Sequence, residues 1–235
     1  MDKTYELPSD AVPYILLQRM NTQKFRNLRY MLPYGRTLYN AIYNNFLYQA
    51  EASLRENEIK DQYLSEMKDE FNTIKDHLPD RTTSILDVGC GVGGIDLFLS
   101  DFYEDSQPIF YLFDKTEVSS SVYYQFKDEA AFYNSLDVAA RALKQNGVNE
   151  KNLYTLDADD FDLTELKDVD LCISLISWAF HYPLDTYLND VVECLAEDGS
   201  LLLDFRKGPD SSKRPSNTLR STRSSRRRKS TDGPS

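Results

Sequence analysis

Short apolar runs alternate with amphipathic stretches through the middle of the chain. Five runs have the length and composition of buried strands, at residues 84–88, 109–113, 153–156, 170–175 and 200–205. Between the second and third runs, residues 129–145 place apolar side chains on one helical face, namely Phe132, Leu136, Ala139, Ala140 and Leu143. Asn146-Gly147 then supplies a typical helix terminator. Strands that alternate with helices predict an α/β fold with a mainly parallel sheet covered on both faces.

Residues 1–80 follow a different, helical pattern. Within residues 36–47, apolar side chains recur at helical spacing, and a charged helix is predicted from about Ala50 to His77, where Leu78-Pro79 ends it. We therefore expect an N-terminal helical extension or cap over residues 1–80, followed by an α/β domain over residues 81–207.

Residues 208–235 form a third zone of different composition. Leu219 is its one bulky apolar residue among Ser, Arg, Lys, Pro and Thr, so this tail cannot bury a core and is expected to be disordered. From Pro209 onward, eight Lys and Arg face two Asp, a net charge of +6, which leaves −17 on the preceding residues for a total of −11. An acidic body repels nucleic acid, so we expect none as a partner of the folded part despite the basic cluster 226–229.

Membrane and metal chemistry find little support in the sequence. No apolar segment approaches the length that a bilayer requires, and residues 1–6 lack a secretory pattern, so a cytoplasmic protein is expected. Cys90, Cys172 and Cys194 are far apart and lack metal-ligand spacing, which predicts reduced thiols and no metal site. No feature of the sequence indicates an oligomeric state.

The richest chemistry lies in residues 85–94, Ile-Leu-Asp-Val-Gly-Cys-Gly-Val-Gly-Gly. Gly89, Gly91 and Gly94 satisfy the G-x-G-x-x-G spacing of dinucleotide-binding proteins, and Asp114 ends the next strand, where a ribose-binding acid belongs. Asp87, however, precedes the first glycine by two residues. A carboxylate there would repel a pyrophosphate and attract the ammonium group of an amino-acid ligand, which favours S-adenosylmethionine over a nicotinamide dinucleotide.

The pattern Asp87-x-Gly89-x-Gly91-x-Gly93 resembles the first motif of class I S-adenosylmethionine-dependent methyltransferases. The resemblance spans residues 81–207 and implies a Rossmann-like three-layer sandwich. Members of this family normally continue past the fifth strand with a helix and an antiparallel two-strand hairpin. This chain continues with the polar tail, so the hairpin is expected to be missing and the fifth strand to be an exposed edge. A truncated or frame-shifted product and a natural variant with a regulatory tail both remain open.

The resemblance also implies roles for individual residues. Asp114 would receive the ribose hydroxyls, Asp157 would accept from the adenine amino group, and the backbone N–H of Ala158 would meet a ring nitrogen. With Asp159, Asp160 and Asp162 adjacent, this register could slip. The predicted cofactor-binding residues are Asp87, Gly89, Cys90, Gly91, Gly93, Asp114, Lys115, Asp157, Ala158, Ser174 and Leu175.

In this family, the end of the fourth strand lies beside the transferable methyl group. Here that strand runs into residues 176–183, which offer Trp178 and Tyr182 as substrate-binding residues and His181 as a catalytic base. His181 could equally pin a loop by a hydrogen bond, and Trp178 could equally be a packing residue.

Residues 132–136 and 174–187 bear a shorter resemblance to sugar O-methyltransferases that act on bacterial glycans or related small molecules. The function expected from the sequence is therefore O-methylation of a small-molecule or sugar hydroxyl. Two alternatives remain open: a nucleotide- or NAD-binding oxidoreductase, and a catalytically inactive methyltransferase-like binding protein.

Overall fold

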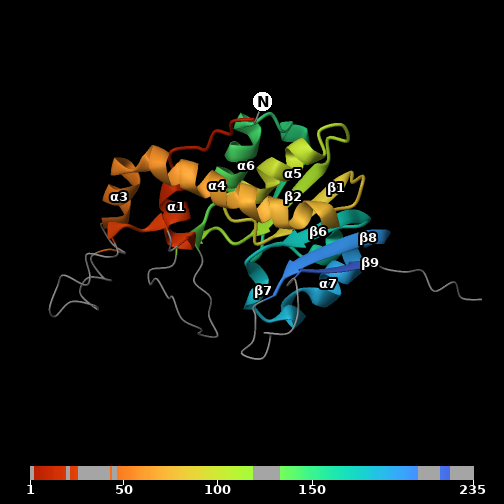
Figure 1. The fold of residues 1–235 in the computed structure, drawn as a ribbon. Helices are drawn as coiled ribbons and strands as arrows, with labels where there is room; N and C mark the ends of the chain where they lie inside the picture. Colours follow the sequence, from red (N-terminus) through yellow and green to blue (C-terminus); the bar gives the residue numbers. More distant parts are fainter. Residues whose placement is uncertain are drawn as a thin grey trace, which may run out of the picture.

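The computed structural model describes residues 3–19, 22–25, 43, 47–118, 133–205 and 218–222. Its centre is a six-stranded sheet with the order β5-β2-β1-β6-β8-β9 (Figure 1). The strands are β1 (Ser84–Val88), β2 (Ile109–Asp114), β5 (Leu153–Asp157), β6 (Val169–Ser174), β8 (Leu195–Asp204) and β9 (Thr218–Thr222). All neighbours pair in parallel except β8 and β9. The chain moves outward from β1 to β5 and then returns to β6 beside β1, which is the Rossmann-like order. The five predicted strands are thus confirmed.

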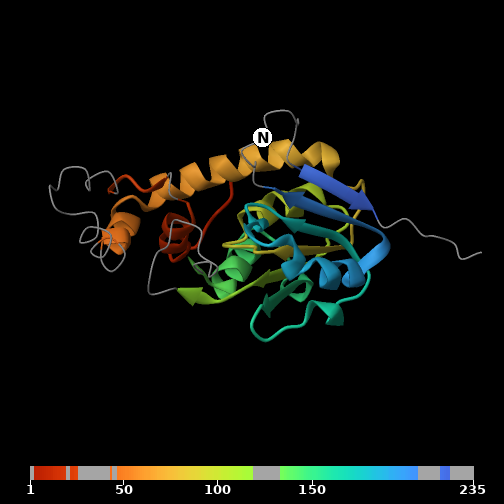
Figure 2. The same cartoon turned by 90° about the horizontal axis from the view of Figure 1, so that it is seen from below.

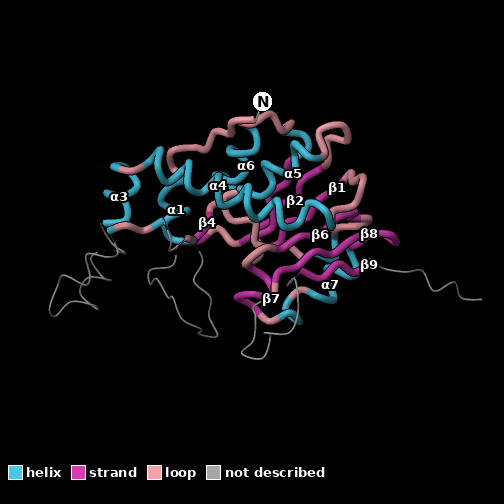
Figure 3. The backbone as a smooth tube through the Cα atoms, in the orientation of Figure 1, coloured by secondary structure: helices cyan, strands magenta, loops and turns pink. Residues whose placement is uncertain are grey.

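Helices and short strands complete the fold (Figure 3). The helices are α1 (Ala11–Gln18), α3 (Tyr48–Leu54), α4 (Glu56–Ile74), α5 (Gly94–Phe102), α6 (Leu136–Gln145) and α7 (Leu188–Cys194), with 3-10 turns η4 (Lys75–His77), η5 (Glu150–Asn152), η6 (Leu163–Glu165) and η7 (Leu184–Thr186). Strands β3 (Glu117–Val118) and β4 (Tyr133–Asn134) form a separate antiparallel pair, and β7 (Ser177–Tyr182) follows β6 closely. Among the described residues, none of the helices combines the length and apolar content that crossing a bilayer requires.

Alternate residues of the central strands enter two separate cores. Ile85 and Leu171 belong to the core shared with α1, α4, α5 and α6, whereas Leu86 and Cys172 belong to the core shared with α7 and η6. Figure 2 shows α4 as one long helix running along the molecule. Because side chains two apart on a strand share a face, Asp87 points to the same side as Ile85, toward α4 and α5.

Two helix boundaries differ from the sequence prediction. α6 begins at Leu136 and not near residue 129, because Tyr133–Asn134 pairs with Glu117–Val118 as a strand. The predicted apolar face holds for Leu136, Ala139 and Leu143, which are buried, while Phe132 lies outside the described residues. The charged helix predicted from Ala50 to His77 is present as α3, α4 and η4, with a break at Arg55. Most of the run at residues 36–47 also lies outside the description.

The edge of the sheet at β8 corrects an expectation. Residues 218–222, within the tail predicted to be disordered, pair antiparallel with residues 200–204 of β8, so this strand is not a bare edge. An unpaired edge exposes backbone N–H and C=O groups that bond readily to another extended segment, and the two threonines of β9 favour that conformation. The basic cluster 226–229 lies outside the described residues.

Candidate functional site

The glycine turn connects β1 to α5 at the carboxyl edge of the sheet. Gly89, Gly91 and Gly93 have φ angles of +81°, +57° and +74°, in the left-handed region that favours glycine, and Gly93 caps the N-terminus of α5. The turn therefore brings backbone N–H groups and the positive end of the α5 dipole to the place where Rossmann-like folds bind ligands.

Substituting Gly89 with alanine should destabilise the protein more than the same change at Gly147. Both glycines have positive φ, which costs a substituted residue about 1–2 kcal/mol. A methyl group on Gly89 would lie 2.5 Å from Cβ of Ser177, whereas nothing lies within 4 Å of one on Gly147. We expect urea unfolding to show a loss of at least about 1 kcal/mol more for Gly89→Ala. Equal losses would mean that the turn is not as tightly packed as described.

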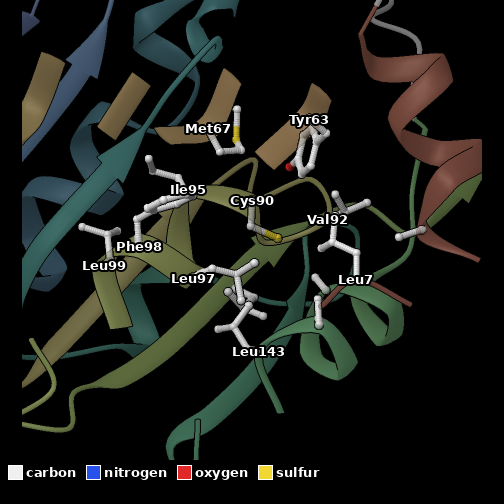
Figure 4. Packing of buried hydrophobic residues seen from close by; sticks show 14 of the residues in the cluster. Leu7, Tyr63, Met67, Cys90, Val92, Ile95, Leu97, Phe98, Leu99 and Leu143 are labelled. Atoms are coloured by element: carbon white, nitrogen blue, oxygen red, sulfur yellow. The ribbon is translucent and has the colours of Figure 1, made fainter. Parts of the chain in front are cut away.

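The N-terminal helices lie against the glycine turn. A methyl group on Gly91 would lie 3.1 Å from Oε1 of Gln18 in α1, and one on Gly94 would lie 2.1 Å from Oη of Tyr63 in α4. Figure 4 shows Tyr63 and Met67 of α4 above the loop that carries Cys90. The extension thus forms one wall of the turn, a contact that the helical pattern of residues 1–80 did not reveal.

Two buried carboxyl groups lie beneath this turn. Asp87 is 3% exposed at the end of β1, and Asp96, the third residue of α5, is fully buried with no hydrogen-bond partner for either side-chain oxygen. Burial and then the charge of Asp96 raise the pKa of Asp87 well above its usual range, and burial raises the pKa of Asp96 to about 7. The sequence analysis identified Asp87 but not Asp96. Asp96 could have been noticed because it is an acidic residue within residues 95–99, which are otherwise apolar.

Asp114 links the end of β2 to the glycine turn. Its Oδ2 accepts the N–H of Gly91 at 2.9 Å, and its Oδ1 accepts the N–H of Lys115 at 2.7 Å. Burial raises the pKa of Asp114 to about 6, although these two N–H groups lower it. Nζ of Lys115 in turn pairs with Oδ2 of Asp159 at 2.8 Å. The predicted residues of the first two strand ends therefore converge on one edge of the sheet.

The end of β5 carries the two residues predicted to bind adenine. Asp157 lies opposite Asp114 in the ladder, and its Oδ1 accepts the N–H of Asp159 at 3.0 Å. The N–H of Ala158, expected to meet a ring nitrogen, donates instead to the main-chain oxygen of Asp114 at 3.0 Å. The β2–β5 ladder continues one residue further than predicted and occupies that donor. The adenine-binding roles of Asp157 and Ala158 stay predictions.

Two residues at the end of β6 also serve the interior of the protein. Oγ of Ser174 donates to the main-chain oxygen of Val88 at 2.6 Å and accepts the N–H of Trp178 at 3.0 Å. This fully buried hydroxyl ties β1, β6 and β7 together, and the cofactor-binding role of Ser174 stays a prediction. Leu175 packs, partly buried, against the core that contains α5.

The predicted substrate residues follow on β7. Trp178 is fully buried, and its Nε1 donates to the main-chain oxygen of Leu184 at 2.9 Å, so it takes the packing role that the sequence left open. His181 and Tyr182 belong to β7, but their side chains lie outside the described part of the structure, and their roles stay predictions. Cys90 is buried in the turn, where burial raises the pKa of its thiol well above the usual range. Within the described ranges, no cluster of three His, Cys, Asp or Glu side chains could hold a metal ion.

Among known proteins, the chain is similar only to solved structures. No family model and no curated protein sequence matches the chain. An O-methyltransferase candidate from Nostoc punctiforme PCC 73102 is 16% identical, with 88% of this chain and 56% of that chain covered and a TM-score of 0.44. Geranyl diphosphate C-methyltransferase from Streptomyces coelicolor A3(2), solved with S-adenosyl-L-homocysteine, is 12% identical, with 58% of this chain and 42% of that chain covered and a TM-score of 0.41. An S-adenosylmethionine-dependent methyltransferase from Mesorhizobium loti is 17% identical, with 58% of this chain and 53% of that chain covered and a TM-score of 0.38. The chain thus spans about half the length of these structures.

Proposed function

We propose that this chain carries an S-adenosylmethionine-dependent methyltransferase domain. The observation that carries the proposal is the pair of buried acids, Asp87 and Asp96, at the N-terminal end of α5. In dinucleotide-binding proteins, the pyrophosphate occupies this end of the first helix.

The charges of the site favour one class of ligand. Two carboxyl groups beneath the turn oppose a phosphate-bearing ligand and favour the ammonium group of an aminoacyl ligand. Asp114, at the end of the next strand, keeps acceptor capacity for sugar hydroxyls beside the two N–H groups that it already binds. The site therefore offers carboxyl groups for an ammonium group and another for a ribose, on either side of the glycine turn. S-adenosyl-L-methionine carries both of these groups.

When bound, this cofactor supplies a methyl group on a positively charged sulfur, already activated for transfer. The protein has to hold the acceptor in line with that bond and exclude water. In the proposed mechanism, Asp87 orients the aminoacyl part and Asp114 orients the nucleoside.

The acceptor that we propose is a hydroxyl group of a small molecule or of a sugar or glycan. The short resemblance of residues 132–136 and 174–187 to sugar O-methyltransferases supports this choice. His181 would remove the hydroxyl proton and Tyr182 would contact the acceptor. The reaction would take place in the cytoplasm.

Replacing Asp87 with asparagine should remove the preference of the site for an ammonium group. We expect calorimetry to show wild-type protein binding S-adenosylhomocysteine about tenfold or more tightly than its analogue without the amino group, with little difference for Asp87→Asn. The exposed Asp105→Asn serves as the control. Tighter binding of NAD than of S-adenosylhomocysteine by wild-type protein would instead favour an oxidoreductase.

Methyl transfer itself is tested with cofactor labelled in the methyl group and a fractionated extract. Label transferred to a hydroxyl-bearing small molecule or glycan would support the proposal, and His181→Ala should then lower kcat by about 10²-fold or more. Tight cofactor binding without transfer to any fraction would instead favour a methyltransferase-like binding protein.

A further inference from the structure

Asn134 is a buried polar residue whose side-chain amide has no partner at hydrogen-bond geometry. It is 3% exposed, and neither Oδ1 nor Nδ2 has a hydrogen-bond partner. An amide left unpaired in the interior costs roughly 1–3 kcal/mol in folding stability. A residue with this cost calls for a compensating role.

The fold places Asn134 at the carboxyl edge of the sheet. Asn134 pairs with Glu117 across β4 and β3, so the chain returns to a point three residues beyond Asp114. The hydroxyl of Thr116 also accepts the N–H of Leu136 at 3.3 Å, which fixes the start of α6 beside the end of β2. Asn134 thus comes back to the strand end where the candidate ribose acid lies.

The surroundings of the amide are those of the nucleoside site. Burial raises the pKa of Asp114, the N–H groups of Gly91 and Lys115 lower it, and the nearby amide of Asn134 lowers it further. The pKa of the buried Cys90 thiol responds to the same amide. The Asn134 amide therefore lies close enough to Asp114 and Cys90 to act on both, although neither of its polar atoms has a partner at hydrogen-bond geometry.

A sugar hydroxyl would satisfy these groups together. A hydroxyl donates one hydrogen bond and accepts others, so it can donate to the Asp114 carboxylate and accept from Nδ2 of Asn134. A neighbouring hydroxyl can donate to Oδ1 of the same amide. We propose that Asn134 is a cofactor-binding residue that completes, with Asp114, a site for the two ribose hydroxyls of the nucleoside. This assignment rests on the proposed function.

The test combines a protein change with a ligand change. Asn134→Ala should weaken binding of S-adenosylhomocysteine about tenfold by calorimetry. Analogues that lack the 2′- or the 3′-hydroxyl should bind wild-type protein more weakly, and for at least one of them Asn134→Ala should make little further difference. The unliganded variant should melt no lower than wild-type protein, because it loses no hydrogen bond.

Asn146→Ala is the matched control. Its amide donates to the main-chain oxygens of Glu6 and Ala142, each at 2.7 Å. This variant should melt at a lower temperature and bind S-adenosylhomocysteine as wild-type protein does. Asn134→Ser provides a second variant, with the same expectations, if the alanine variant does not fold.

The outcomes separate this assignment from the proposed function. Wild-type protein that fails to bind S-adenosylhomocysteine would overturn both. Wild-type binding together with unchanged binding by the Asn134 variants would overturn the role of Asn134 alone. A loss of the same size for S-adenosylhomocysteine and both deoxy analogues would also overturn that role.

Discussion

Replacing Asp114 with alanine should lower the affinity of the chain for S-adenosylhomocysteine by about 10²–10⁴-fold, because two hydrogen bonds to a charged group are lost at about 1.5–3 kcal/mol each. The carboxylate is fixed by the N–H groups of Gly91 and Lys115, so it is held ready for the ribose hydroxyls before the ligand arrives. Calorimetric titration with S-adenosylhomocysteine and with adenosine measures the loss, which should be of similar size for both ligands.

Two further variants give this result its meaning. Asp114→Asn keeps one acceptor for the backbone and should lose less affinity than Asp114→Ala. Asp160→Ala removes an exposed acid just beyond the end of β5 and should bind as wild-type protein does. If Asp114→Ala folds and its affinity for both ligands falls less than about threefold, Asp114 is not a ribose-binding residue.

The central strands of the sheet could be predicted from the sequence because β1 and β6 are buried on both faces. Such strands appear as short continuous apolar runs, and β1, β2 and β6 follow these runs closely. The start of α6 could not be predicted in this way. Two residues of the apparent helix, Tyr133 and Asn134, pair with a strand elsewhere, and such pairing overrides local periodicity.

The site was only partly visible for a related reason. Glycine spacing and strand-end acids are local signals, and they identified Asp87 and Asp114. The pairing of Asp87 with Asp96, the use of the Ala158 N–H in a ladder and the buried hydroxyl of Ser174 depend on contacts between separate elements. Local sequence does not specify such contacts.

The buried acid pair has a consequence for stability that can be measured without any ligand. Asp96→Asn should stabilise the unliganded protein at pH 8, because the wild-type protein must keep a charge in its interior there. Burial raises the pKa of Asp96 from its ordinary 3.8 to about 7. Between these values the unfolded chain releases a proton that the folded chain keeps, so wild-type stability from this group is lost as the pH rises toward 7.

Because burial moves the pKa of Asp96 from 3.8 to about 7, at most about 4 kcal/mol of stability depends on the ionisation of this group. Urea unfolding should therefore show the advantage of Asp96→Asn over wild-type protein growing by about 2–3 kcal/mol from pH 5 to pH 8. Asp61→Asn, an exposed change on α4, should differ from wild-type protein by less than about 0.5 kcal/mol at both pH values.

Ligand binding should reverse part of this penalty, because the ammonium group of S-adenosylhomocysteine offers the ionised carboxylate of the pair a partner. Binding should then tighten more steeply with rising pH for wild-type protein than for Asp96→Asn. An advantage of Asp96→Asn that stays constant from pH 5 to pH 8 would show that Asp96 does not titrate in this range. Parallel pH profiles of binding would show that the pair does not face the ammonium group.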